Sequence, residues 1–165
     1  MEDLTKKKQD IIKIRKAEDS DIELIIPIML EISKLHEEGR PDIFKEKTRI
    51  DAEKELKDKV NSGISHILVC NINEATICGI LIYRVKYIEN HNNLKDTKIL
   101  WIEEIGVNEK YRRQGIGSRL IKEVRNIARK EGCSRVELNC WCFNENAIKF
   151  YKKIGMKEQR INMEI

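Results

Sequence analysis

The sequence YRRQGIGSRLI, residues 111–121, joins an apolar strand pattern to a strongly amphipathic helix pattern. Gly115 and Gly117 lie at the junction, after two arginines and a glutamine. Glycine adopts positive φ readily and lets backbone N–H groups approach a ligand without a Cβ in the way. The first N–H groups of a helix have no partner inside it and lie at its positive dipole end. The stretch therefore predicts an anion site at a helix N-terminus, with Arg112 and Arg113 adding positive charge.

Two common phosphate-binding loops do not fit this stretch. A Walker A loop has a lysine directly after its last glycine, whereas Ser118 follows Gly117. A dinucleotide-binding fingerprint needs a third glycine, and Leu120 occupies that position. A tight turn that only packs the helix onto a sheet stays open as the alternative interpretation.

Hydrophobic periodicity along the rest of the chain predicts alternating strands and helices. Strands are expected at residues 11–17, 65–71, 76–88, 98–107 and 135–140, with at least one more in 156–165. Helices are expected from the capping residues 19–21 to about 38, and at 48–61, 119–130 and 144–154. Pro27 predicts a kink or a break in the first helix. Hairpin-like strands in the middle and a strand–helix–strand unit near the end predict an α+β (mixed α/β) domain with one parallel strand pair.

Composition sets the broad class. The chain has 165 residues, 41% of them hydrophobic and 36% charged, which predicts one globular domain over residues 1–165 with 1–10 as a frayed lead-in. No apolar run is long enough for a membrane span or a signal peptide. The odd count of five cysteines favours reduced, mostly buried thiols in the cytoplasm. The C-x-C spacing at Cys140 and Cys142 and the scattered histidines predict no metal site.

Two motifs together carry a resemblance to a known family. Arg112-x-x-Gly115-x-Gly117 resembles the R/Q-x-x-G-x-G/A signature of the GNAT superfamily of acetyl-CoA-dependent N-acetyltransferases. NENAIKFYKKIG, residues 144–155, is similar to a second hallmark of that family, and the likeness covers nearly the whole chain from Ile11. It implies three layers, in which helices flank a central, mostly antiparallel sheet that splays.

The resemblance also implies ligands and partners. The cosubstrate would be acetyl-CoA, and the acceptor a small-molecule or peptide amine. The pyrophosphate would be bound by a loop that comprises Arg112, Arg113, Gln114, Gly115, Ile116, Gly117 and Ser118. The pantetheine arm would pair like an added strand with backbone groups of Ile105, Gly106 and Val107. No nucleic-acid or membrane partner is implied, and a homodimer stays open.

Acetyl transfer to an amine requires a base for the ammonium and an acid for the departing thiolate. By resemblance Tyr151 would place its hydroxyl near the thioester sulfur, and an ordinary pKa near 10 keeps that hydroxyl protonated. A core tyrosine is the alternative. Asn144 would bond to the pantetheine arm or cap its helix.

Glu103 and Glu104 in the run WIEEIGV are the candidate bases, because apolar neighbours raise a carboxyl pKa. In a regular strand only one of them would face the cleft, whereas a bulge would bring both round. The run is similar to the acidic strand of polyamine acetyltransferases. The alternative is one solvated and one salt-bridged glutamate. We expect Phe44 to be an exposed loop residue and His36 a cap or surface residue.

Three functions compete at this point. The first is an N-acetyltransferase that moves an acetyl group directly from acetyl-CoA to a primary amine. The second is a non-catalytic CoA-binding regulatory module. The third is nucleic-acid binding, for which the net charge of +4 leaves room. The basic helix at 119–130 contains an interspersed glutamate, which is typical of a solvated face rather than a nucleic-acid surface.

Overall fold

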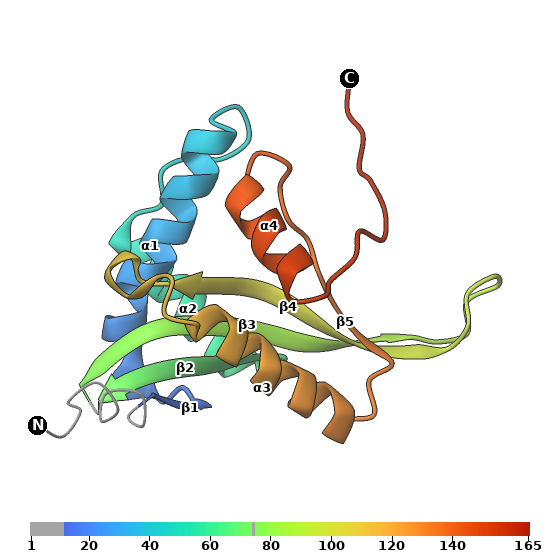
Figure 1. Cartoon of the computed structure of the whole chain (residues 1–165), viewed down its shortest axis with the longest axis horizontal. Helices are drawn as coiled ribbons and strands as arrows, with labels where there is room; N and C mark the ends of the chain where they lie inside the picture. The colour runs from blue at the N-terminus through green and yellow to red at the C-terminus, as the bar shows by residue number, and fades with distance from the viewer. Residues whose placement is uncertain (1–11, 74) are drawn as a thin grey trace, which may run out of the picture.

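The fold is described from a computed structural model, which covers residues 12–73 and 75–165 (Figure 1). The predicted lead-in at 1–10, the first residue of the strand predicted at 11–17, and Glu74 of the turn between the second and third strands lie outside the described residues.

In the part of the chain that the structure describes, five strands form a central sheet in the spatial order β1-β2-β3-β4-β5. Neighbouring strands pair antiparallel except for β4 and β5, which pair parallel across the α3 crossover, as the strand–helix–strand pattern predicted. The strands are β1 (Lys13–Lys16), β2 (Ser65–Asn73), β3 (Thr76–Ile88), β4 (Thr97–Val107) and β5 (Arg135–Leu138).

Helices cover both faces of this sheet and make a three-layer domain (Figure 1). One apolar cluster joins α1 (Ile22–Gly39) and α2 (Arg49–Ser62) to β2 and β3. A second cluster joins α3 (Ile116–Lys130) to the opposite face, and Phe150 and Ile154 at the end of α4 (Glu145–Lys153) pack against it. The predicted fold class and layer arrangement are therefore confirmed.

Local signals explain most helix boundaries. Thr48 caps α2 and forms a capping box with Asp51. A lowered pKa of Asp21, caused first by its hydrogen bonds from Arg15, fits the ion pair that anchors the start of α1 at 2.6 Å. The predicted break at Pro27 is wrong, because α1 is continuous through it. Pro27 is exposed in the second turn, where water can solvate the carbonyl that loses its partner.

The strand predicted in residues 156–165 is absent. The tail is extended but pairs with no strand of the described sheet; side-chain contacts hold it instead, Glu164 to Arg40 at 2.6 Å and Gln159 to Glu137 at 2.9 Å. Its alternating apolar side chains Ile161 and Met163 are exposed. A strand-like pattern without a partner edge forms no ladder. No helix of the described residues is long and apolar enough to cross a membrane.

Candidate active site

The predicted anion loop lies between β4 and α3, where the first N–H groups of α3 have no partner inside the helix. Gly115 is the N-cap of α3 with φ 78°, and no side chain among the described residues caps the helix. Arg113 also has a positive φ, 63°, which its sequence did not indicate. Left-handed residues in such a turn make neighbouring N–H groups converge into an anion-binding concavity. A Cβ on Gly115 would meet no atom within 4 Å, so the space beside this turn is free.

Gly117 has a different use from Gly115. It lies in the first turn of α3, and a Cβ there would come within 3.1 Å of the Phe150 ring. The missing side chain therefore lets α4 approach the N-terminus of α3. A large side chain at Gly117 would displace Phe150, and with it the neighbouring Tyr151, as well as crowd the loop.

Arg112 is engaged by protein groups. Its Nε donates to the carbonyl of Val107 at 3.0 Å, and its Nη2 pairs with Glu31 of α1 at 3.1 Å. The same Glu31 carboxylate accepts from the backbone N–H of Glu109 at 3.1 Å. The guanidinium thus connects the end of β4 to α1 and stabilises the loop.

The parallel pairing of β4 with β5 ends at Ile102 and Leu138, although β4 continues to Val107. Ile105, Gly106 and Val107 pair with β3 on one side, and on the other side no described strand covers them. Gly106 also lets α1 come close, because a Cβ there would lie 2.6 Å from Ile32. The sheet therefore splays beside three backbone units that can receive an extended ligand.

A bulge decides how the two glutamates of β4 are arranged. Glu104 is opposite Ile82 and Ile102 is opposite Tyr83, which leaves Glu103 as an extra residue. The side chains that pack toward α3 are accordingly Leu100, Ile102, Ile105 and Val107. Glu103 and Glu104 both face the α1/α2 side as a result. Of the two arrangements that the sequence left open, the bulged one is present.

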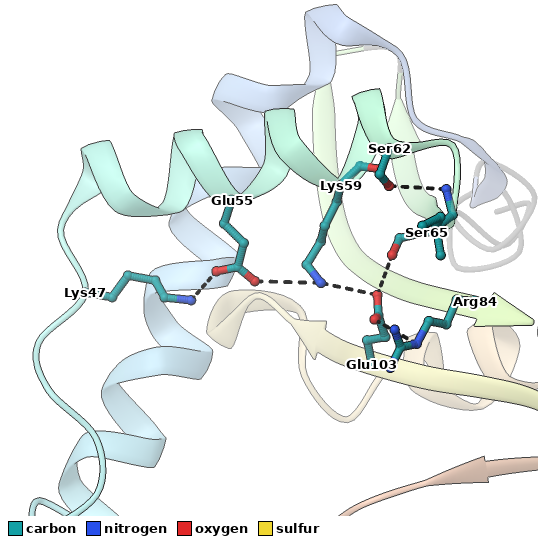
Figure 2. Close-up of polar contacts among 8 residues, drawn as sticks. Lys47, Glu55, Lys59, Ser62, Ser65, Arg84 and Glu103 are labelled. Carbon is teal, nitrogen blue, oxygen red and sulfur yellow. Dashed lines mark hydrogen bonds and ion pairs between the residues drawn. The ribbon is translucent and has the colours of Figure 1, made fainter. Parts of the chain in front are cut away.

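Glu103 is held in a line of charged groups (Figure 2). It accepts from Ser65 at 2.8 Å and pairs with Lys59 at 3.2 Å and with Arg84 at 3.3 Å. Lys59 in turn is 3.9 Å from Glu55, which pairs with Lys47 at 2.6 Å. Burial alone would raise the pKa of Glu103, but Ser65 and the two cations together hold it below its ordinary value. Glu103 is therefore an ionised, paired carboxylate.

Glu104 is the opposite case. Its pKa is raised to about 7, first by burial and then by the negative charge of Glu55. Lys47 and Lys59 act in the other direction but do not outweigh these causes. No described side chain forms a salt bridge with it under 4 Å. A carboxylate with a pKa close to neutrality can take up and release protons.

Tyr151 and Asn144 reach this region from α4. Burial raises the pKa of the Tyr151 hydroxyl above its ordinary value, and the charges of Cys140 and Glu104 add to the shift, which places these groups near one another. The hydroxyl is therefore a proton donor at any physiological pH. Asn144 caps α4, since its Oδ1 accepts from the Ala147 N–H at 3.1 Å. The capping alternative for Asn144 is the one that the structure shows.

A cluster of aromatic rings beside the site was missed by sequence reasoning. Phe44 stacks on His36 with ring centroids 5.1 Å apart and contacts Trp141 edge-on at 5.4 Å. Phe143 packs against the rings of His36 and Trp141. Phe44 is partly buried rather than exposed, and His36 is an internal ring whose pKa is lowered by burial and by Lys47. These rings come from the end of α1, the loop after it and the segment between β5 and α4, which sequence spacing does not place together.

The cysteines differ from expectation in part. All five thiols are free, and Cys70 and Cys78 are buried as predicted. Cys133 and Cys140 are half-buried, and Cys142 is exposed, so the expectation of buried thiols is wrong for the last of these. Cys142 follows β5 in the loop that also contains Trp141.

A family model described as "Acetyltransferase (GNAT) family" matches residues 29–156. The chain belongs to this family. Among curated GNAT relatives, thialysine N-epsilon-acetyltransferase of Sus scrofa is 39% identical over 59 residues, which are 36% of this chain and 35% of that protein. Glucosamine 6-phosphate N-acetyltransferase 1 of Dictyostelium discoideum is 32% identical over 94 residues, 57% of this chain and 55% of that protein. The matches thus span about a third to about half the length of these relatives.

Solved structures support the GNAT fold. A mutant of the BH1408 protein from Bacillus halodurans superposes with a TM-score of 0.88 over 93% of this chain and 98% of its own, at 23% identity. At that identity the likeness concerns the fold alone. The shared fold extends over nearly the whole of both chains.

Proposed function

We propose that this protein moves an acetyl group from acetyl-CoA to a primary amine by direct transfer, with Glu104 as the base and Tyr151 as the acid. The observation that carries the proposal is the combination of a carboxyl group that titrates near neutral pH and a tyrosine hydroxyl that stays protonated. Glu104 has a pKa of about 7, and beside it Tyr151 stays protonated. We also propose that residues 1–165 form a single N-acetyltransferase domain.

The residues present fit acetyl-CoA, which GNAT enzymes use as cosubstrate. The uncapped N-terminus of α3 and the left-handed residues Arg113 and Gly115 offer N–H groups and space for a pyrophosphate. The uncovered side of Ile105, Gly106 and Val107 offers strand-type hydrogen bonds to a pantetheine arm. When bound there, acetyl-CoA supplies an activated acetyl thioester.

Glu104 receives the proton of the incoming ammonium, directly or through one water molecule. An amine must be neutral to attack a carbonyl, and a base with a pKa near the working pH is the most effective. Glu103 does not suit this role, because Lys59 and Arg84 stabilise its ionised form and lower its proton affinity. The choice between the two carboxylates, which the sequence left open, therefore falls on Glu104.

Tyr151 donates its hydroxyl proton to the sulfur as the thiolate departs. Burial keeps this proton on the oxygen until a strong base forms beside it. Asn144 and the contact between Phe150 and Gly117 fix α4, which carries Tyr151, against α3. Backbone N–H groups on the uncovered side of β4 are placed to polarise the acetyl carbonyl.

The test is release of free CoA, measured with a thiol reagent, from acetyl-CoA mixed with a panel of amines. We expect amine-dependent thiol release by the whole protein, with an acetylated amine found by mass spectrometry. Calorimetry with acetyl-CoA provides the second readout. Binding without thiol release for any amine would favour the non-catalytic CoA-binding module, and absence of both would contradict the family function for this chain.

A further inference from the structure

A groove of about 930 Å³ lies on the sheet over the paired part of β4 and β5, and nothing in the proposed chemistry uses it. Its walls come from the second half of β3, the loop between β3 and β4, the first half of β4, β5, the tail, and Ile64 just after α2. No residue of α1 or α2 lines it, so it occupies the part of the α1/α2 face that those helices leave uncovered. The charged and aromatic side chains that line it include Arg84, Lys86, Trp101, Arg135, Glu137 and Arg160.

Strand register puts these side chains on one face. Arg84 is opposite Trp101, and Trp101 is opposite Glu137 on β5. The residues that alternate with them, such as Tyr83 and Leu100, belong to the apolar cluster on the α3 side. The groove is therefore formed by one face of three adjacent strands, and Arg160 of the tail also lines it.

The groove is strongly cationic. Five lysine and arginine side chains line it, against the acidic groups of Asp96 and Glu137. Glu137 is already paired with Arg135, and Arg84 with Glu103. Within the described residues, Lys86 and Arg160 form no salt bridge. Burial, followed by the charge of Arg84, lowers the pKa of Lys86, as expected for a cation crowded by other cations.

Trp101 gives the groove an apolar floor. Its ring is partly exposed, and the Nζ of Lys86 lies 3.3 Å from the ring centroid. This cation–π contact holds the ammonium of Lys86 over the ring, and both side chains line the groove. An aromatic plane beside fixed positive charge suits an organic anion with a carbon skeleton.

The groove is close enough to the catalytic residues to share a ligand with them. Trp101 precedes Glu104 by three residues on β4, which corresponds to about 10 Å along a strand and less across a bulge. Arg84 links the two regions, because it lines the groove and pairs with Glu103. A ligand that places an amine at Glu104 would extend its other end toward Lys86.

We propose that this groove binds the carboxylate or phosphate of an acceptor whose primary amine lies at Glu104, so that the substrates are amines that carry an anionic group. This inference rests on the proposed function and names its substrate class. Polyamines are disfavoured, since their second ammonium would meet Lys86 and Arg160, while Glu103 is already neutralised by Lys59 and Arg84.

Two matched pairs of amines test the substrate class. L-lysine is compared with cadaverine, the same diamine without the carboxylate, and glucosamine 6-phosphate is compared with glucosamine. With the wild-type protein, we expect the anionic member of at least one pair to have a KM at least tenfold lower. The pair that shows the preference tells a carboxylate from a phosphate. Equal KM values within both pairs, or a preference for cadaverine, would overturn the inference while leaving the acetyltransferase function intact.

The variant Lys86→Gln/Arg160→Gln tests the residues. We expect it to raise the KM of the anionic amine about tenfold or more, to change that of the neutral or cationic partner less than twofold, and to leave kcat and the KM of acetyl-CoA unchanged. Lys122→Gln/Lys130→Gln removes the same net charge from exposed positions of α3 and should have no such effect. An equal effect of both double variants would attribute the preference to overall charge and contradict the groove.

A binding readout separates this inference from the catalytic proposal. In a Trp141→Phe background, the remaining fluorophore is Trp101, and its emission is followed during titration with glucosamine 6-phosphate and with L-lysine in the absence of acetyl-CoA. We expect a saturable change that the Lys86→Gln/Arg160→Gln variant weakens about tenfold. This result with no thiol release would support the groove and refute the catalysis. No fluorescence change with either ligand at millimolar concentration, together with no KM preference, would reject the groove.

Discussion

Arg112 and Glu31 form an ion pair of 3.1 Å that connects the loop before α3 with the middle of α1. Because Arg112 also donates to the Val107 carbonyl, its guanidinium holds the end of β4 in place. Arg112→Ala should therefore raise the Kd of acetyl-CoA about tenfold, and Glu31→Gln should raise it in the same direction by a smaller factor. Calorimetry measures both.

Glu31→Gln separates this supporting role from direct phosphate binding. If the guanidinium bound the pyrophosphate, loss of the competing carboxylate would free it, and the affinity for acetyl-CoA would rise. Lys110→Ala removes one exposed positive charge from the same loop and serves as the control, with an expected change below twofold.

Glu104→Gln should lower kcat by about 10²- to 10⁴-fold at pH 8, the usual contribution of a general base. In the wild-type protein, the active form has Glu104 ionised, so the rate should rise through pH 7 and level off above it, because its pKa is about 7. The variant should lose this rise. A pH–rate profile of kcat/KM with the same inflection in the variant would contradict the assignment.

Urea unfolding tests whether the loss of activity in Glu104→Gln comes from a loss of folding. The folded-state pKa of Glu104 is raised above its ordinary 4.5, so its contribution to stability is fully present below pH 4.5 and is lost as the pH rises through 7. The amide of Glu104→Gln has no charge to lose. We expect this variant to be more stable than wild type at pH 8 by about 3 kcal/mol in urea unfolding, and nearly equal at pH 4.

Glu103→Gln should leave activity largely intact but move the pH profile. The charge of Glu103 raises the pKa of Glu104, whereas Lys59 lowers it. Removing Glu103 leaves Lys59 and Arg84 without their shared carboxylate, and the inflection near pH 7 should shift to lower pH. Loss of turnover comparable to that of Glu104→Gln would instead make Glu103 the base.

The glycine turn before α3 was predictable from the sequence because its cause is local. Two glycines and a helix start within a few residues specify the turn, and the positive φ of Gly115 confirms it. The bulge was not predictable, since WIEEIGV has the same composition in either register and only the pairing with β3 makes Glu103 the extra residue. The partners of Glu103, Lys59 and Arg84, come from α2 and β3.

The tail shows the opposite limit. Its alternating pattern satisfies the local rule for a strand, but a ladder needs a neighbouring edge that sequence periodicity cannot supply. The helix of Pro27 shows the same limit, because packing against the sheet stabilises α1 by more than the loss of one hydrogen bond near its start destabilises it.

Tyr151→Phe should lower kcat by about 10²-fold while the Kd of acetyl-CoA changes less than twofold, because only the proton donor is lost. The raised pKa of Tyr151 adds a second expectation: the wild-type rate should show no decline from tyrosine ionisation up to pH 10. Turnover equal to wild type would remove the acid role.

Asn144 tests whether α4 is positioned by its cap. The side chain accepts from the Ala147 N–H, so Asn144→Ala should destabilise the protein by about 1 kcal/mol and lower the Tm by about 3 °C. Because Tyr151 is carried by this nine-residue helix, kcat should fall as well. Asn144→Asp keeps a capping oxygen and should restore both properties. If Asn144→Asp restored stability but left the KM of acetyl-CoA raised, the amide N–H₂ would be donating to the pantetheine arm rather than only capping α4.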